Sequence, residues 1–365
     1  MKLVLKNARL TDEQLFDIII EGNRISKITK DYQGEGKVIN LAGRYYVSCG
    51  WIDLHTHAFP KYKPYCANPD EIGYQTGVTT VVDAGSSGYE DINEFYELTR
   101  TCKTRVLSFL NVSRIGLKKI DELADLANLQ FEPIKKAYQN YPNFIVGLKA
   151  RMSASVVKGN GIKPLQIAKK FANKLDLPLM VHIGSEPPGI EEILDELEQG
   201  DIVTHCFNGK DNNIFRNQDQ AVPQLQLALD RGVLLDIGHG TESFSFQTAR
   251  KARRNQIRFD TISTDIYDKN KMEGPVYDMA TTLTKLLYLD YCLEDIIKAV
   301  TEMPAKILKQ EGLGKIEEGA IADLTIFEVQ KKNITLIDSY GETVDFDKKI
   351  VPKSVVLGGE YIELK

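Results

Sequence analysis

The stretch GWIDLHTHAFP, residues 50–60, is an apolar run that ends in two histidines separated by one threonine. In a β-strand, residues two positions apart point to the same face, so His55 and His57 would lie side by side while Thr56 faces away. The chain contains only five histidines. Two neutral imidazoles on one strand face are a typical pair of metal ligands, although this short motif is weak evidence by itself.

The run is the first of eight short apolar runs between residues 46 and 266. Amphipathic stretches such as DINEFYELTRTC (91–102) and KPLQIAKKFANKL (163–175) separate them. Strands that alternate with helices over about 250 residues predict an α/β fold of the (β/α)8 TIM-barrel type. A doubly wound sheet is the alternative, but there is no GxGxxG motif after the first run. The eight runs are YVSCGWIDLH (46–55), VTTVVDAG (78–85), RVLSFLNVS (105–113), FIVGLKARM (144–152), LPLMVHIGS (177–185), DIVTHCF (201–207), GVLLDIGHG (232–240) and FDTISTDI (259–266).

The two ends of the chain follow a different pattern. Apolar and polar residues alternate in stretches such as LFDIIIEGNRISKIT (15–29) and PKSVVLGGEYIEL (352–364), with Gly or Asn at the turns. Alternation with a period of two is typical of strands that bury one face. We therefore expect a small β-sandwich domain assembled from residues 1–49 and 312–365, beside a barrel formed by residues 50–311.

Composition and charge exclude several classes of function. The chain has 365 residues, a net charge of −5 and scattered basic residues, so we expect no nucleic-acid partner. Its most basic stretch, ARKARRNQ (249–256), is interpreted as a solvated helix end. No run approaches the about 18 apolar residues of a membrane helix, and we expect no membrane partner. Five cysteines without a CxxC pair, and no apolar signal segment, indicate a cytoplasmic protein.

Polar residues stand at the carboxyl ends of the predicted strands, where barrels of this type place their active sites. Lys149 ends the fourth run and Asp265 ends the eighth. Every histidine also falls at such an end, which is hard to reconcile with five independent core histidines. These are His55, His57, His182, His205 and His239. We therefore predict a metal site at this rim of the barrel.

Lys149, in IVGLKARMS, is the most informative of these residues. Burial lowers the pKa of a lysine because desolvation disfavours the ammonium form. A neutral amine can add CO2 to form a carbamate, and the two carbamate oxygens would bridge two metal ions. A carbamate would explain why a buried lysine lies among cationic neighbours.

Together these motifs resemble the binuclear branch of the amidohydrolase superfamily, which carries a carboxylated lysine. GLGKIEEGAIADLTIF (312–327) resembles the segment that returns from the barrel to the small domain, so the resemblance covers essentially the whole chain. VVDAGSSG (81–88), DIGHGTESFSF (236–246) and EGPVYDMATTLTKLL (273–287) are similar to the deacetylase group, which is related to dihydroorotase, hydantoinase and D-aminoacylase. The matching residues are the histidines of DLHTH, Lys149 of GLKA, His182 of MVHIG, His205 of THCF and Asp265 of STDIYD.

The resemblance implies a mechanism that uses two divalent metal ions. Zinc suits nitrogen and oxygen donors of this kind better than manganese or iron. A metal-bridging hydroxide would attack an amide or ester carbonyl, and Asp265 would pass its proton to the leaving group. The implied activity is deacetylation of a small N-acyl or O-acyl carboxylate. The implied ligands are His55, His57 and Asp265 for the more buried ion, His182 and His205 for the other, and carboxylated Lys149 as the bridge.

Three rim residues are candidates for substrate binding. Arg151 would hold a substrate carboxylate through two hydrogen bonds, or would equally serve as a structural ion-pair partner. The resembled pattern does not use His239 as a ligand, and we predict that it donates or accepts a hydrogen bond with the substrate. Asn208, in HCFNG, is a further candidate donor.

Other activities stay open at this point. A cyclic amidohydrolase of the hydantoinase or dihydroorotase type shares the pattern, but dihydroorotases carry an arginine shortly after HxH, whereas this chain continues Ala58, Phe59, Pro60. A mononuclear deaminase of the same fold would not need Lys149. A catalytically silent, ligand-binding barrel is disfavoured because the whole ligand set is present. The sequence does not set the oligomeric state, and a homo-oligomer is compatible with this architecture.

Overall fold

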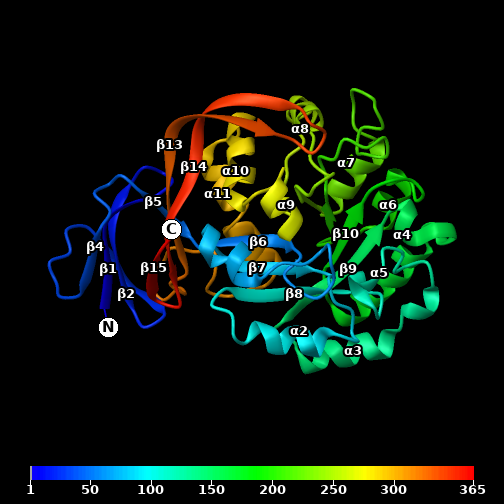
Figure 1. The fold of residues 1–365 in the computed structure, drawn as a ribbon, viewed down its shortest axis with the longest axis horizontal. Helices are drawn as coiled ribbons and strands as arrows, with labels where there is room; N and C mark the ends of the chain where they lie inside the picture. Colours follow the sequence, from blue (N-terminus) through cyan, green and yellow to red (C-terminus); the bar gives the residue numbers. More distant parts are fainter. Residues whose placement is uncertain (1) are drawn as a thin grey trace.

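The computed structural model describes residues 2–365. Two sheets organise them: a seven-stranded parallel sheet that curls into a barrel, and an eight-stranded mixed sheet built from both ends of the chain (Figure 1). The (β/α)8 fold class predicted from the sequence is confirmed. None of the helices in this range is long and apolar enough to span a bilayer.

The barrel strands pair in chain order, and every pair is parallel. Parallel strands need long crossovers, which the helices between them provide. The strands are buried almost throughout, as expected when a sheet is covered on both faces. They are β6 (Trp51–Thr56), β7 (Val78–Ala84), β8 (Arg105–Asn111), β9 (Ile145–Met152), β10 (Leu179–Ile183), β11 (Ile202–Thr204) and β12 (Leu234–Asp236).

The eighth predicted strand closes the barrel without becoming a regular strand. Residues 261–266, here called the closing segment, form only isolated parallel bridges to β12 and β6. Asp265 N donates to His55 O at 2.6 Å, and His57 N donates to Ile266 O at 2.9 Å. Asp265 has a φ of 51°, in the left-handed region, and this conformation interrupts regular pairing. The irregularity therefore falls on the residue that carries the candidate catalytic carboxylate.

Helices surround the barrel (Figure 1). The two amphipathic stretches named above form α2 and α5, and α5 buries Leu165, Ala168 and Ala172 at helical spacing. The basic stretch 249–256 begins inside α8 and runs past its end, as predicted. The helices are α1 (Pro69–Ile72), α2 (Ile92–Thr99), α3 (Phe131–Asn140), α4 (Ala154–Val157), α5 (Lys163–Leu175), α6 (Ile190–Glu196), α7 (Pro223–Asp230), α8 (Phe246–Arg254), α9 (Asp268–Glu273), α10 (Met279–Tyr288), α11 (Leu293–Lys298) and α12 (Glu302–Ile307), with 3-10 turns η1 (Tyr74–Thr76), η2 (Gly116–Lys118), η3 (Leu126–Asn128) and η4 (Lys158–Asn160).

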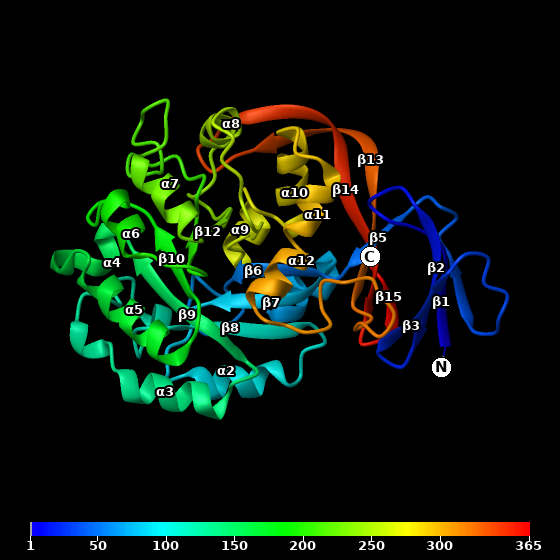
Figure 2. The same cartoon turned by 180° about the vertical axis from the view of Figure 1, so that it is seen from behind.

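The second sheet joins the two ends of the chain, which lie side by side in Figure 2. Trp51, the first residue of β6, packs against Phe327 with ring centroids 5.4 Å apart and so connects this sheet to the barrel. The sheet contains β1 (Lys2–Arg9), β2 (Leu15–Glu21), β3 (Arg24–Thr29), β4 (Lys37–Asn40), β5 (Tyr46–Cys49), β13 (Leu324–Ile337), β14 (Thr343–Leu357) and β15 (Glu360–Glu363). The boundaries at 49 and 312 as limits of separate domains stay a prediction.

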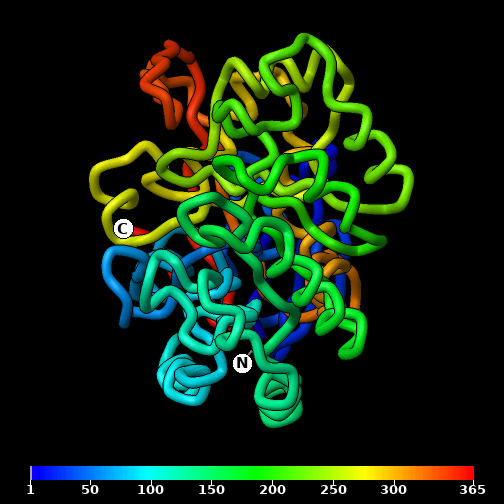
Figure 3. Tube along the Cα trace, turned by 90° about the vertical axis from the view of Figure 1, so that its right-hand side faces the viewer, coloured from blue at the N-terminus to red at the C-terminus, as the bar shows by residue number. Residues whose placement is uncertain are grey.

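β13 and β14 form a long hairpin that extends beyond its sheet and arches over one side of the barrel (Figure 1). In the tube view of Figure 3 the red hairpin projects to the edge of the molecule. At its tip, Ser339 N donates to Phe244 O at 3.0 Å, in the loop that precedes α8. The hairpin thus joins the terminal sheet to the loop that follows β12.

Candidate metal centre

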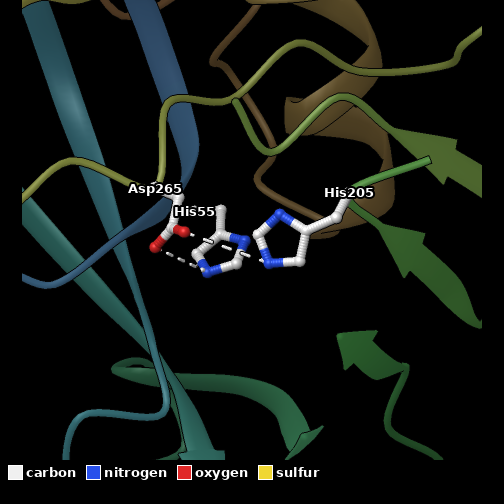
Figure 4. A group of neighbouring side chains, drawn as sticks. All are labelled: His55, His205 and Asp265. Carbon is white, nitrogen blue, oxygen red and sulfur yellow. Dashed lines mark ion pairs between the residues drawn. The ribbon is translucent and has the colours of Figure 1, made fainter. Parts of the chain in front are cut away.

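Three side chains from different strand ends converge inside the barrel mouth (Figure 4). Nε2 of His55, on β6, lies 3.4 Å from Oδ1 of Asp265 in the closing segment. Nε2 of His205, directly after β11, lies 4.0 Å from Oδ2 of the same carboxylate. One ligand atom from each residue lies within 4.8 Å of the other two. Imidazole nitrogens and a carboxylate oxygen at this spacing form a candidate metal site.

The other predicted ligand residues lie around this group. Nε2 of His57 is 2.9 Å from Oδ1 of Asp265, and Nζ of Lys149 is 3.3 Å from Nε2 of His55. The ring of His182 meets the ring of His205 edge-on, with centroids 4.5 Å apart. The structure therefore brings all six predicted ligand residues together. The assignment of each residue to a particular ion stays a prediction.

The histidine nitrogens show that these residues fit a metal ion. Nδ1 of His205 lies 2.5 Å from Gly238 O, and a carbonyl only accepts, so Nδ1 carries the proton and Nε2 carries the lone pair. Among residues 2–365, that buried Nε2 has no hydrogen-bond partner. A buried polar atom without a partner is costly, and a metal ion would satisfy it.

Burial sets the charge of the cluster. Desolvation lowers the pKa of Lys149 to about 7, against the opposing charges of Asp265 and Asp236. Desolvation also lowers the pKa of His205 to about 4 and holds the pKa of His55 well below its usual value. Metal ligands must be deprotonated, so neutral imidazoles and a neutral amine are the forms that the site needs.

Asp265 behaves in the opposite way. Burial acts to raise the pKa of its carboxyl, but the hydrogen bond and charge of His57, followed by the charges of His205 and Lys149, outweigh it and leave the pKa lowered. The group is therefore a carboxylate at neutral pH. It places a negative charge in direct contact with the imidazole of His57 and 3.4 Å from Nε2 of His55.

Two glycines make space for these side chains. Gly85 has a φ of 80°, and a Cβ there would lie 2.7 Å from Cγ of Lys149. Gly240 has a φ of 56°, and a Cβ there would lie 2.6 Å from Oδ2 of Asp265. Only glycine combines this backbone conformation with so close an approach. The glycines explain part of the VVDAGSSG and DIGHG patterns in the sequence.

Arg151 forms the structural ion pair that was one of its two predicted roles. Nε and Nη2 of its guanidinium contact the two oxygens of Glu122 at 2.8 and 3.1 Å, and Nη2 also donates to Ile120 O at 2.8 Å. Glu122 is fully buried. A two-bond clamp on a substrate through the same nitrogens would have to break this pair. Nη1 is the nitrogen that these contacts do not use, and its contact with a substrate stays a prediction.

His239 and Asn208 are fully buried, and their polar atoms contact the protein itself. Nε2 of His239 lies 2.8 Å from Nζ of Lys285, and Nδ1 lies 2.9 Å from Gly240 O. Nδ2 of Asn208 donates to His205 O at 2.9 Å, and its Oδ1 accepts from Lys210 N at 3.0 Å. These contacts favour structural roles over the substrate contacts predicted from the sequence, which stay untested.

A buried carboxylate that the sequence patterns did not reveal is linked to the site through one hydroxyl group. Asp236, the last residue of β12, accepts hydrogen bonds from the hydroxyls of Thr204 (2.7 Å), Thr261 (2.8 Å) and Ser263 (2.6 Å). The Thr204 hydroxyl also lies 2.8 Å from Nδ1 of His55. The available signal was an aspartate inside the apolar run GVLLDIGHG, where a charged residue needs partners.

Comparisons with curated proteins find relatives along the whole chain. A deacetylase of Enterococcus faecalis is 45% identical over 99% of both chains. A deacetylase of Brucella anthropi is 35% identical over 95% of this chain and 87% of its own length. Residues 316–362 match the family model described as a deacetylase-like composite domain. That match covers most of the C-terminal contribution to the second sheet.

Solved structures give the same architecture. The crystal structure of an adenine deaminase superposes with a TM-score of 0.97, at 44% identity over 99% of both chains. The crystal structure of a dihydroorotase superposes with a TM-score of 0.93, at 33% identity over 100% of this chain and 98% of the other.

The barrel, the terminal sheet and the cluster of imidazoles with one carboxylate define a member of the amidohydrolase superfamily. Relatives that match from end to end place the chain more closely. It belongs to the deacetylase-like group of that superfamily, which is structurally close to dihydroorotase and the hydantoinases.

Proposed function

We propose that the protein is a metal-dependent deacetylase that hydrolyses an amide or ester bond of a small acylated carboxylate. One observation carries the proposal: the six ligand-type residues lie in one cluster, in which the buried Nε2 of His205 has no hydrogen-bond partner among residues 2–365. The 45% identity to a deacetylase along the whole chain supports an acetyl group as the group that is removed. A small-molecule substrate is part of the same proposal, and a homo-oligomer is compatible with it.

The cluster would hold two divalent ions, with zinc favoured by the nitrogen-rich donor set. When bound, such ions lower the pKa of water toward neutrality and polarise a carbonyl group. Lys149 would join the two ions as a carbamate, because its amine is buried against His55 and has no carboxylate in hydrogen-bond contact among residues 2–365. The ligands would be His55, His57 and Asp265 on one side and His182 and His205 on the other.

Asp265 is the proton-transfer group in this proposal. Its Oδ1 lies 2.9 Å from Nε2 of His57, and its lowered pKa keeps the group a carboxylate at neutral pH, which is the form that can accept a proton. A general base must accept a proton from water and return it to the departing amine or alkoxide. The left-handed backbone of Asp265 turns this carboxylate into the barrel mouth, where it meets the imidazoles.

An aromatic wall links the cluster to Arg151. The ring of Tyr65 lies 5.5 Å from the ring of His57 and 5.2 Å from the ring of Tyr267, and the Arg151 guanidinium lies 6.0 Å from the Tyr65 centroid. Nη1 of Arg151 would therefore hold the substrate carboxylate at the edge of the site. The two tyrosine rings would exclude water from the acyl group.

Two neighbouring activities are the competing candidates. The adenine deaminase that superposes at a TM-score of 0.97 favours deamination, and the dihydroorotase at 0.93 favours opening of a cyclic amide. The proximity of Lys149 to His55 favours a two-ion hydrolase over a one-ion deaminase, which would not need the lysine.

A substrate panel separates these candidates. Purified protein, loaded with zinc, is incubated with N-acetyl and O-acetyl derivatives of D- and L-acids, with hydantoins, with dihydroorotate and with adenine. Release of acetate from at least one acylated acid is the expected result. Ammonia release from adenine, or ring opening without acetate release, would overturn the deacetylase proposal.

A further inference from the structure

Asp236 is the last residue of β12 and is not among the predicted metal ligands. Its carboxylate is fully buried and accepts three hydroxyl hydrogen bonds, from Thr204, Thr261 and Ser263. A buried carboxylate needs such donors to remain charged. Of the three donors, Thr204 alone also contacts a predicted metal ligand, with its Oγ1 2.8 Å from Nδ1 of His55.

The directions of these hydrogen bonds follow from the donors available. A hydroxyl has one proton, and the Thr204 proton lies in its 2.7 Å contact with Oδ2 of Asp236, because a carboxylate can only accept. The same oxygen can therefore only accept from Nδ1 of His55. His55 must then carry its proton on Nδ1 and its lone pair on Nε2.

Nε2 of His55 is the nitrogen that faces the candidate metal centre. It lies 3.4 Å from Oδ1 of Asp265 and 3.3 Å from Nζ of Lys149. In the opposite tautomer Nε2 would carry a hydrogen and could not bind a metal ion. The chain Asp236–Thr204–His55, here called the relay, therefore selects the tautomer that can act as a ligand.

We propose that Asp236 is a positioning residue that acts through Thr204 to fix the tautomer and ring orientation of His55, and thereby sets the affinity of the centre for its metal. The inference rests on the proposed metal-dependent function for its consequence. The tautomer itself is a property of the metal-free protein. Outer partners of ligating histidines typically change metal affinity by about 10–100-fold when removed.

The first experiment needs no variant. Long-range 15N–1H NMR spectra of the metal-free, 15N-histidine-labelled protein distinguish the two tautomers of each ring, and the chain has only five histidines. A His55→Gln sample identifies the His55 signals. The relay predicts that His55 is neutral with its proton on Nδ1. A proton on Nε2 in the folded, metal-free protein would overturn the proposal.

A pair of matched variants then tests the consequence. Thr204→Val removes the hydroxyl inside the relay, whereas Thr261→Val removes a different hydroxyl from the same carboxylate and leaves His55 untouched. Zinc affinity, measured by competition with a chelator, should fall about 10–100-fold in Thr204→Val and by less than about threefold in Thr261→Val. Thr204→Ser keeps the hydroxyl and should restore wild-type affinity.

The outcomes separate this inference from the proposed function. Equal zinc affinity in Thr204→Val and Thr261→Val would overturn the relay even if the wild type is an active deacetylase. A wild type that binds zinc through the relay but releases no acetate would leave the relay standing and refute the deacetylase proposal. If Thr204→Val does not fold, the tautomer of His55 in the wild type still decides the question.

Discussion

The barrel contains two buried contacts between a lysine and a histidine, and they have different surroundings. Nζ of Lys149 lies 3.3 Å from Nε2 of His55, and Nζ of Lys285 lies 2.8 Å from Nε2 of His239. Both lysines are almost completely buried, and desolvation lowers the pKa of each to about 7. Residue type, burial and pKa are therefore the same in the two pairs.

The partners around each pair make the difference. Lys285 also donates to Pro275 O at 2.7 Å, and Nδ1 of His239 contacts Gly240 O, so that pair is complete within the protein. The Lys149 pair lies beside Asp265 and beside Nε2 of His205, which has no hydrogen-bond partner within the described range 2–365. A buried acceptor nitrogen without a donor distinguishes the candidate metal centre from a satisfied core contact.

The largest expected effect on activity comes from changing Asp265, the carboxylate beside the Lys149–His55 pair. Asp265→Asn removes the proton acceptor, and kcat/KM for the best acetylated substrate should fall by at least about 10²–10⁴-fold. Asp260→Asn is the matched control. Asp260 lies just before the closing segment, at the opposite end from Asp265, and its carboxylate accepts a hydrogen bond from Leu235 N. Comparable losses in both variants would point to a folding defect and count against a catalytic role for Asp265.

A second prediction concerns Arg151, which lies on the same strand as Lys149, β9. Arg151→Lys keeps the charge but loses the planar guanidinium, which pairs with Glu122 and whose Nη1 is proposed to hold the substrate carboxylate. Because substrate binding weakens, KM should rise about tenfold with a smaller change in kcat. Steady-state kinetics on an acylated acid and on its uncharged amide would measure this. An unchanged KM together with a lowered Tm would show that Arg151 serves only the ion pair.

The smallest expected effect is on the pH dependence of stability, and it comes from Lys285 in the second pair. The pKa of Lys285 is about 7 in the folded protein and near 10.5 in the unfolded chain. Between these values the unfolded chain binds more protons, so the free energy of unfolding contributed by Lys285 rises with pH, by at most about 1.4 kcal/mol per pH unit. Below the folded pKa this contribution is constant.

Lys285→Met removes that contribution and keeps the length of the side chain. Urea unfolding of the two metal-free proteins at pH 7, 8 and 9 gives the comparison. The stability of the wild type relative to Lys285→Met should increase over this range. A difference that stays flat with pH would mean that Lys285 is protonated in the folded protein.

The sequence predicted the convergence of the site because parallel barrel strands bring their carboxyl ends to one rim. His55, His57 and Asp265 meet for that reason, although Asp265 follows the two histidines by more than 200 positions along the chain. Burial and partners could not be predicted in the same way. Glu122 lies in a loop without periodicity, so its pairing with Arg151 had no signal in the pattern.

His239 illustrates the same limit. It ends a strand like the other histidines, yet Lys285 reaches it from α10. Since a lysine within a helix usually reaches solvent, nothing in the sequence around Lys285 indicated that its side chain would be buried. The irregular closing segment was also beyond prediction, because the left-handed conformation of Asp265 depends on contacts from both neighbouring strands.

The most direct test of whether Lys149 holds metal ions is the metal content per chain. Elemental analysis would measure it in the wild type, Lys149→Ala and Lys285→Ala, after each protein is loaded with zinc and the excess is removed. We expect about two zinc ions per chain in the wild type and in Lys285→Ala, and one or fewer in Lys149→Ala. Equal metal content in the wild type and Lys149→Ala would contradict this expectation, since Lys149 would then be no more a ligand than Lys285.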